Sequence, residues 1–306
     1  MRTEILMAVY NGERFLAEQI DSILQQDTDE WHLTISDDGS TDNSSAIIRQ
    51  YINDFPEKIA QAFPPQRFGD AKKHFFWLMK NCSAEYLLFC DQDDVWHADK
   101  VSKTVAALHT SEGQWGKQTP VLVFTDQTVV DEELREIAPS MMALQQQDPD
   151  VRDYRSLLIR NVVTGCTVGI NAAMAALAAR CAAPERTLMH DWWLGLVAAR
   201  FGKMVYRNES SMLYRQHSRN SVGAKDVRKL AYYVDRFLNQ AYLNEQMRAK
   251  KQQATVFLES FEELLTADEC RTLRAFSKKR ISLGDKLKFL KHVSSPLRKL
   301  DFLIRW

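Results

Sequence analysis

Three aspartates stand together in the segment Asp91-Gln92-Asp93-Asp94, directly after an apolar stretch. In an extended chain that leaves a strand, residues two apart point the same way, so Asp91 and Asp93 share a face. Two carboxylates held close together repel each other unless a cation lies between them. A hard divalent ion such as Mg²⁺ or Mn²⁺ takes oxygen ligands and keeps further positions open for phosphate oxygens. Taken alone, the segment is explained equally well as a metal site and as a solvated acidic loop.

A second acidic segment, Asp37-Asp38-Gly39-Ser40-Thr41-Asp42, also allows two interpretations. Aspartate, serine and glycine dominate turns and helix N-caps, so a turn followed by a cap is the simpler interpretation. A carboxylate at the end of a strand also accepts hydrogen bonds from a nucleobase or a ribose, which a cap does not require. The segment is therefore a candidate nucleotide contact.

The segment His190-Asp191-Trp192-Trp193 opens a predicted helix. Asp191 fits the N-cap position, where an aspartate side chain accepts hydrogen bonds from the free N–H groups of the first turn. A partly apolar setting between aromatic side chains would also raise the pKa of Asp191 toward the range of a general base. The two roles are compatible, so the segment supplies a candidate proton acceptor.

Cationic side chains gather in the segment 214–220, which contains Arg215, His217 and Arg219. Guanidinium groups pair well with diphosphate oxygens, and a neutral imidazole is a good metal ligand. A flexible basic loop on the surface is the alternative interpretation.

Apolar runs at four places predict buried strands that alternate with helical patterns. The strands are expected at residues 5–9, 32–35, 85–90 and 121–124. Such alternation is typical of an α/β fold with a mostly parallel sheet flanked by helices. In these sheets ligands bind beyond the carboxyl ends of the strands, which is where the acidic segments lie. Beyond residue 164 the pattern becomes helical, and from about residue 225 onward it is almost entirely so.

Composition favours a cytoplasmic protein without a nucleic-acid partner. The 306 residues are 45% apolar and 26% charged, and the formal net charge is zero, although residues 271–306 hold eleven Lys/Arg against two Asp. The five cysteines form no Cys-x-x-Cys pair, which is typical of reduced thiols. No apolar run approaches the roughly 20 residues that span a bilayer, and the start shows no signal-peptide pattern.

Read together, these segments resemble the family 2 glycosyltransferases, which have the GT-A fold, a Rossmann-like α/β arrangement. Their order and spacing agree over about residues 3–222. The matching stretches are Met7-Ala8-Val9-Tyr10-Asn11-Gly12, Ser22-Ile23-Leu24-Gln25-Gln26, residues 35–42, Asp91-Gln92-Asp93-Asp94-Val95-Trp96 and His190-Asp191-Trp192. The resemblance predicts a GT-A catalytic domain at residues 1–222 and a helical, basic C-terminal region at residues 223–306.

The resemblance also implies a role for single positions. Asp191 would be the catalytic base. Asp93, with Asp91 and His217, would bind the Mn²⁺ or Mg²⁺ ion that bridges the diphosphate of the donor. Tyr10 would stack or pack beside the nucleobase. The donor-binding residues that the resemblance implies are Ala8, Tyr10, Asn11, Asp38, Asp91, Arg215 and Arg219.

Two positions bear on how closely the family pattern is followed. Residue 8 is Ala where the family often has Thr or Pro, so a nucleobase contact there would use the backbone only. The additional Asp94 resembles a subgroup that includes bacterial rhamnosyltransferases and O-antigen hexosyltransferases. No role is assigned to Asp94 itself.

The activity that the resemblance implies is a single in-line displacement, which inverts the anomeric centre. The donor would be rhamnose, glucose or galactose linked to UDP or dTDP. The acceptor would be a hydroxyl of a polyprenyl-diphosphate-linked saccharide in O-antigen synthesis. The C-terminal segment interleaves apolar and cationic residues, which suits either contact with the cytoplasmic face of the inner membrane or packing on the catalytic domain.

Two other functions stay open. A sugar nucleotidyltransferase would need a Gly-rich phosphate loop with a basic residue after the first strand, and Tyr10-Asn11-Gly12-Glu13 differs from that pattern. A non-catalytic nucleotide-sugar-binding protein would keep the fold but would not hydrolyse a donor.

Overall fold

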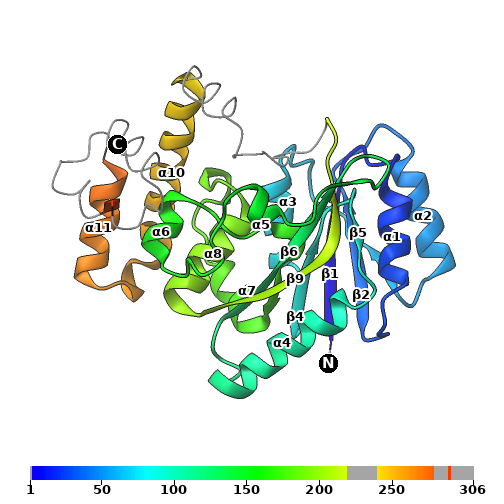
Figure 1. Cartoon of the computed structure of the whole chain (residues 1–306), viewed down its shortest axis with the longest axis horizontal. Coiled ribbons are helices and arrows are strands. Elements are labelled where there is room, and N and C mark those ends of the chain that lie inside the picture. Colours follow the sequence, from blue (N-terminus) through cyan, green and yellow to red (C-terminus); the bar gives the residue numbers. More distant parts are fainter. Residues whose placement is uncertain (1, 219–239, 279–288, 291–306) are drawn as a thin grey trace.

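The computed structural model describes residues 2–218, 240–278 and 289–290, and it shows a curved central sheet with helices on both faces (Figure 1). The strands are β1 (Thr3–Val9), β2 (Trp31–Asp37), β3 (Ile59–Gln61), β4 (Tyr86–Cys90), β5 (Val95–Trp96), β6 (Val121–Val130), β7 (Glu136–Ala138), β8 (Gly169–Asn171) and β9 (Lys203–Arg215). Their order across the sheet is β3-β2-β1-β4-β8-β6-β9-β5, and β7 pairs with β6.

Helices connect most of these strands. The α-helices are α1 (Leu16–Leu24), α2 (Ser44–Asp54), α3 (Ala71–Lys80), α4 (Lys100–Trp115), α5 (Met141–Leu144), α6 (Tyr154–Ile159), α7 (Ala172–Ala178), α8 (His190–Phe201), α10 (Gln240–Phe261) and α11 (Ala267–Ser277). Short 3-10 turns occupy η1 (Gly165–Thr167), η2 (Pro184–Arg186) and η3 (Glu262–Leu264).

The predicted α/β fold with a mostly parallel sheet is confirmed. Strands β3, β2, β1 and β4 run parallel to one another, and β6 is parallel to β9. Strand β8 lies antiparallel between β4 and β6, while β5 and β7 are short antiparallel partners at the margins. Because β1, β2 and β4 are parallel neighbours, the loops that follow them meet at one edge of the sheet.

Alternate residues of β1 face different cores. Ile5, Met7 and Val9 belong to one buried cluster with residues of α1 and α2, whereas Leu6 belongs to a second cluster with residues of α3 and α8. All four side chains are at most 1% exposed. Side chains alternate across a strand, so an unbroken apolar run of this kind is buried on both faces. This burial fixes the register of the strand and hence the position of the loop that follows it.

Strand β9 corrects the prediction that the chain is helical beyond residue 164. It has thirteen residues and pairs in parallel with β6 along its length. Its sequence, Lys203 to Arg215, is rich in polar residues and only partly buried, so it lacks the apolar pattern that identifies the other strands. Pairing with β6 therefore decides this element, and it brings Arg215 and His217 toward the ends of β1 and β4.

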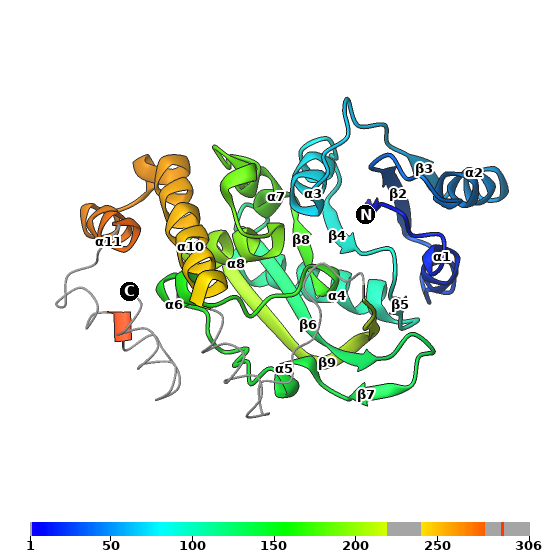
Figure 2. The ribbon, with the colours of Figure 1, turned by 90° about the horizontal axis from the view of Figure 1, so that it is seen from above.

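The C-terminal helices pack on the sheet domain. Phe257 and Phe261 of α10 each lie with their ring centroids 5.7 Å from that of Trp193 in α8. Figures 1 and 2 show α10 and α11 at the end of the molecule opposite α1 and α2. The predicted boundary after residue 222 lies outside the described residues, as does most of the basic segment. Within the described ranges, no helix is long and apolar enough to cross a membrane.

The junction between α8 and β9 packs closely against Pro120, and this contact can be tested. An ideal Cβ on Gly202 would lie 2.2 Å from the carbonyl oxygen of Pro120, which also accepts the hydrogen bond of Lys203 N at 2.8 Å. We expect Gly202→Ala to lower the free energy of unfolding by about 1–3 kcal/mol, because backbone rather than a flexible side chain must move. Urea unfolding measures this.

Gly113→Ala is the matched control for Gly202→Ala. Gly113 is an exposed residue of α4, and an ideal Cβ there meets nothing within 4 Å. The better helix propensity of alanine should leave the protein as stable or more stable by up to about 1 kcal/mol. Equal stability of the two variants would contradict the proposed close contact.

Candidate active site

The acidic segments meet at the carboxyl edge of the parallel strands. Tyr10 follows β1, Asp38 follows β2 and Asp91 follows β4, and β1 pairs with both β2 and β4. The ladder between β1 and β2 continues to the hydrogen bond from Asp38 N to Val9 O at 2.8 Å. The topology thus brings three separate loops side by side.

The loop after β1 is tied to the loop after β2 through side chains. Asn11 N donates to Ser40 Oγ at 2.9 Å, and Thr41 N donates to Asn11 Oδ1 at 2.8 Å. Gly12 N donates to Ser44 Oγ at 2.8 Å. Asn11 has a φ of +49°, a left-handed conformation that asparagine tolerates better than most residues. Its side chain thus holds the two loops together, and its expected donor contact stays a prediction.

Asp38 anchors a third loop. Its carboxylate is 5% exposed and accepts hydrogen bonds from Phe68 N at 2.5 Å and Gly69 N at 2.7 Å. The same loop carries Arg67, whose guanidinium carbon lies 4.5 Å from the centroid of the Tyr10 ring. Tyr10 is 43% exposed, so it offers a flat surface at the rim of the site.

Ala8 occupies the last part of β1 beside these loops. It is partly buried and lies opposite Ser36 of β2. Its methyl group has no hydrogen-bonding atom, so any polar contact at this position must come from the backbone, as expected for an alanine here.

The structure brings Asp93 and His217 together from distant parts of the chain. His217 Nε2 lies 2.8 Å from Asp93 Oδ2, and the two side chains are 7% and 15% exposed. Burial raises the pKa of Asp91, and the charges of Asp93 and Asp191 raise it further. Gly165, which donates to Asp191, precedes Cys166, whose sulfur lies within 4.8 Å of ligand atoms of Asp91 and Asp94, so the predicted base lies close to Asp91.

The donor set suits a hard divalent cation. Carboxylate oxygens and a neutral imidazole are ligands that Mn²⁺ and Mg²⁺ accept. Among the described residues, ligand atoms of Asp91, Asp94 and Cys166 also lie within 4.8 Å of one another. One oxygen of the buried Asp94 carboxylate, Oδ2, has no hydrogen-bond partner. Asp91 is common to this group and to the predicted set, but among the described residues Asp91, Asp93 and His217 do not form a group with ligand atoms this close together. The structure brings Asp93 to His217 and Asp91 to Asp94.

Asp94 and Arg215 join the acidic loop to β9. Asp94 is fully buried, and its Oδ1 accepts a hydrogen bond from Arg215 N at 3.0 Å. The guanidinium of Arg215 is 2% exposed. It donates to the carbonyl oxygens of Asp93 at 2.9 Å and Glu132 at 2.5 Å, and it pairs with the carboxylate of Glu18.

This placement of Arg215 differs from the expectation that it faces the donor. The guanidinium points into the protein and holds the loop of Asp93 and Asp94 in place. A direct contact of Arg215 with the donor stays a prediction, and it would require the ion pair with Glu18 to open. The predicted donor residue Arg219 lies outside the described residues.

Asp191 sits in the first turn of α8 without capping it. The helix begins at His190 with Met189 as the N-cap residue, so the N-cap interpretation of Asp191 is wrong. Its carboxylate instead accepts hydrogen bonds from Gly165 N at 3.0 Å, from Trp192 N, and from Asn161 Nδ2 at 3.3 Å. Burial raises the pKa of Asp191 to about 7 although these donors lower it. A carboxylate with this pKa is suited to accept a proton near neutral pH.

A buried imidazole supports the loop that holds Asp191. The ring of His190 lies 4.3 Å from that of Phe75, and burial lowers the pKa of His190 to about 3. An ideal Cβ on Gly165 would lie 2.6 Å from His190 Nε2. Glycine at position 165 therefore lets the neutral ring pack beneath the peptide that donates to Asp191.

Comparison with known proteins decides the family. Residues 4–155 match the family model described as Glycosyl transferase family 2. The chain belongs to this family. The dTDP-rhamnosyl transferase RfbG of Shigella flexneri is 28% identical over 241 residues, which cover 74% of this chain and 76% of that protein. The UDP-Glc:alpha-D-GlcNAc-diphosphoundecaprenol beta-1,3-glucosyltransferase WfgD of Escherichia coli is 25% identical over 104 residues, which cover 34% of this chain and 40% of that protein.

Solved structures share the fold of this glycosyltransferase. S. aureus TarS 1-349 in complex with UDP matches with a TM-score of 0.60 at 14% identity, over 99% of this chain and 83% of that chain. The mannosyltransferase PcManGT from Pyrobaculum calidifontis, in complex with GDP-Man and Mn²⁺, matches with a TM-score of 0.51 at 14% identity, over 99% and 85%. The fold is the GT-A fold, and at this identity the likeness concerns the fold alone.

Two cationic residues near the site of this glycosyltransferase, Arg67 and Lys100, are not among the predicted site residues. Arg67 reaches the Tyr10 ring from a loop that no apolar pattern marks. Lys100 is buried, and its ammonium donates to Cys166 O at 2.8 Å and Ser211 Oγ at 2.9 Å. Burial lowers the pKa of Lys100 to about 8, although the negative charges of Asp91 and Asp94 raise it. A lysine at the first residue of a helix, where the dipole favours anions, is the sequence feature that could have revealed it.

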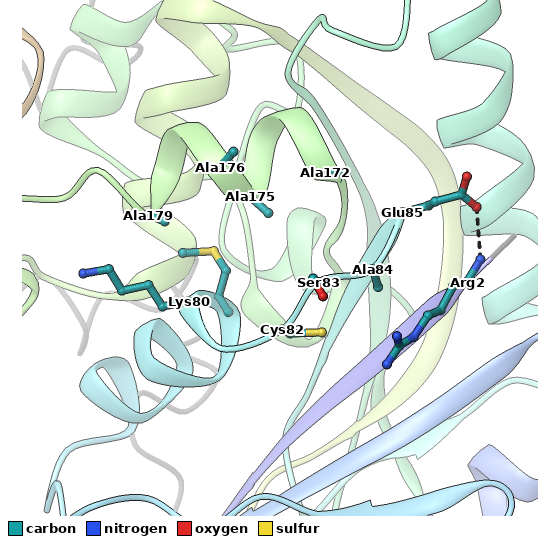
Figure 3. A pocket seen from close by; sticks show the side chains of 11 residues that line it. Arg2, Lys80, Cys82, Ser83, Ala84, Glu85, Ala172, Ala175, Ala176 and Ala179 are labelled. Atoms are coloured by element: carbon teal, nitrogen blue, oxygen red, sulfur yellow. Dashed lines mark hydrogen bonds between the residues drawn. The ribbon is translucent and has the colours of Figure 1, made fainter.

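A separate shallow cavity lies at the opposite edge of the sheet. Figure 3 shows it where β1 and β4 begin, with Arg2 and Glu85 hydrogen-bonded at its margin. The alanines of α7 and the side chains of Lys80 and Cys82 line its other side. Because ligands of such sheets bind beyond the carboxyl ends of the strands, the acidic edge is the candidate active site of this glycosyltransferase.

Proposed function

We propose that this family 2 glycosyltransferase is a metal-dependent, inverting enzyme. Its donor would be rhamnose, glucose or galactose linked to dTDP or UDP. The observation that carries the proposal is the placement of Asp191: a buried carboxylate with a pKa of about 7 interacts with Asp91, beside Asp93 and His217. This arrangement supports a proton acceptor next to a diphosphate-binding site.

The acceptor would be a hydroxyl of a polyprenyl-diphosphate-linked saccharide in cell-surface polysaccharide synthesis, such as that of O-antigen. The relatives RfbG and WfgD support this, because their names specify a dTDP-rhamnosyl transfer and a diphosphoundecaprenol acceptor. Such an acceptor would place the enzyme in the cytoplasm, at the cytoplasmic face of the inner membrane.

In the proposed mechanism, Asp191 accepts the proton of the acceptor hydroxyl as its oxygen attacks the anomeric carbon. The bond from that carbon to the diphosphate breaks on the opposite side, so one attack inverts the anomeric centre. A divalent ion, when bound by Asp91, Asp93 and His217, supplies positive charge to the departing diphosphate. The hydrogen bonds from Gly165 and Asn161 orient the carboxylate of Asp191.

Replacing the base tests the mechanism. We expect Asp191→Asn to lower the transfer rate by about 10²–10⁴-fold, the usual contribution of a general base, while the dissociation constant of UDP or dTDP stays within about twofold. Transfer is measured with radiolabelled donors, and nucleotide binding by calorimetry. Asp54→Asn, an exposed aspartate at the end of α2, is the control. Wild-type turnover in Asp191→Asn would sink the assignment.

The pH profile follows from the raised pKa of Asp191. Below about pH 7 the carboxyl group holds its proton and cannot accept another, so kcat/KM should rise with pH and level off above about 7. Saturating Mn²⁺ favours the ionised form of Asp91 during the measurement. Asn161→Ala removes a hydrogen bond that lowers the pKa of Asp191, so the rising limb should move to higher pH. A flat profile between about pH 5.5 and 8, a range that extends at least about 1 unit on each side of this pKa, would contradict the role of Asp191.

Removing the metal tests the role of Asp93. We expect Asp93→Ala to lose the part of nucleotide binding that depends on Mn²⁺, because a metal ligand and the partner of His217 both disappear. Calorimetry with and without Mn²⁺ measures the difference. Chelation by EDTA should weaken nucleotide binding of the wild type and leave that of Asp93→Ala unchanged. An equal effect of EDTA on both proteins would count against Asp93 as a ligand.

A further inference from the structure

Gln92, between the two predicted metal ligands, binds the backbone of a single residue with both ends of its amide. Its Oε1 accepts a hydrogen bond from Tyr10 N at 2.7 Å, and its Nε2 donates to Tyr10 O at 3.1 Å. A backbone residue has one donor and one acceptor, and a glutamine amide offers the complementary pair. The two polar groups of Tyr10 are thus both satisfied by one side chain.

This contact replaces backbone pairing where a ladder has ended. The register between β1 and β4 stops at Met7 and Cys90, after which the chain departs to form the acidic loop. On the other side of β1, pairing with β2 continues as far as Val9 and Asp37. The amide of Gln92 therefore acts as a substitute peptide group that extends the β4 side of the ladder to Tyr10.

Gly12 leaves the space that the amide of Gln92 occupies. An ideal Cβ on Gly12 would lie 2.6 Å from Gln92 Oε1. The backbone of Gly12 cannot easily withdraw, because its N–H donates to Ser44 Oγ and its carbonyl accepts hydrogen bonds from Phe15 N and Leu16 N. A methyl group at position 12 would therefore displace the tip of the flexible glutamine side chain from Tyr10.

We propose that Gln92 is a positioning residue for the nucleotide: it holds Tyr10 at a fixed distance from Asp91 and Asp93. This rests on the proposed function and on the nucleobase contact predicted for Tyr10, so that one nucleoside diphosphate would contact both the Tyr10 ring and the metal-binding carboxylates. A ligand that bridges two loops binds best when their spacing is set in advance. Gln92 itself touches neither the reacting atoms nor the base.

A double-mutant cycle between positions 12 and 92 tests the proposal. The variants are Gln92→Ala, Gly12→Ala and the double variant, and calorimetry measures their dissociation constants for UDP, dTDP and GDP with Mn²⁺. Each single change should weaken binding about tenfold, which corresponds to about 1.4 kcal/mol. The double variant should bind like Gln92→Ala, because the methyl group at position 12 then meets no amide. The proposal would be overturned if the two single effects on the dissociation constant multiplied in the double variant.

Kinetics separate positioning from general stability. The donor KM should rise about tenfold in Gln92→Ala, while kcat stays within about threefold because Asp191 is untouched. Gln114→Ala and Gly113→Ala, exposed neighbours on α4, should leave the donor KM at its wild-type value. A lower melting temperature in Gln92→Ala with an unchanged donor KM would reduce Gln92 to a structural role and overturn the proposal.

Amide hydrogen exchange of the free protein tests the contact between Gln92 and Tyr10 without any ligand. Exchange at Tyr10 N–H should be about tenfold faster than in the wild type in Gln92→Ala and in Gly12→Ala, and no faster in the double variant than in Gln92→Ala. Failure of the wild type to bind any nucleotide would overturn the proposed function together with the positioning role. Nucleotide binding that all three variants retain at wild-type affinity would overturn the role of Gln92 alone.

Discussion

The site depends on holding like charges together in a buried space. Asp91, Asp93, Asp94 and Asp191 meet at one edge of the sheet, and two charges 4 Å apart repel by about 4 kcal/mol at an effective dielectric of 20. The protein offsets part of this repulsion from within. His217 is within hydrogen-bonding distance of Asp93, and the positive charge of Lys100 attracts Asp91 and Asp94. Backbone N–H groups donate hydrogen bonds to Asp94 and Asp191. Burial raises the pKa values of Asp91 and Asp191, and repulsion from Asp93 and Asp191 raises that of Asp91 further. A divalent cation and the proton of an acceptor hydroxyl are the charges that would relieve this repulsion.

Polar side chains that form hydrogen bonds to neighbouring loops keep this arrangement in place. Asn11, Asp38 and Arg215 are predicted to bind the donor, and in the structure each uses hydrogen-bonding atoms on a neighbouring loop. Side-chain bonds to backbone suit this purpose, because loops beyond a sheet have no ladder to hold them. Tyr10, Asp91 and Asp93 are then presented from a rigid frame. In such a frame the groups that hold the loops matter to function as much as the groups that touch the ligand.

Sequence patterns predicted the part of the fold in which burial is regular. β1, β2, β4 and β6 are apolar runs that are all present, although β6 continues to Val130, six residues beyond its predicted end. β9 escaped prediction because its polar residues give no periodic pattern, and pairing with β6 determines it. For the same reason Lys100 and Arg67 are not among the predicted site residues: each reaches the site from an element whose position depends on packing. The predicted N-cap position of Asp191 was wrong by two residues, since Met189 is the N-cap residue and the helix begins at His190.

By itself, the sequence determined the chemistry available and the edge at which it gathers. Apolar strands followed by Asp37-Asp38 and by Asp91-Gln92-Asp93 are local features, and parallel pairing of such strands sends their ends to one side. Only the tertiary structure decided which side chains meet there. Three features of the site join residues far apart in the chain: the contact of His217 with Asp93, the burial that raises the pKa of Asp191, and the hydrogen bonds between Gln92 and Tyr10. Desolvation and cross-chain hydrogen bonds exist only after packing, so no short segment encodes them alone.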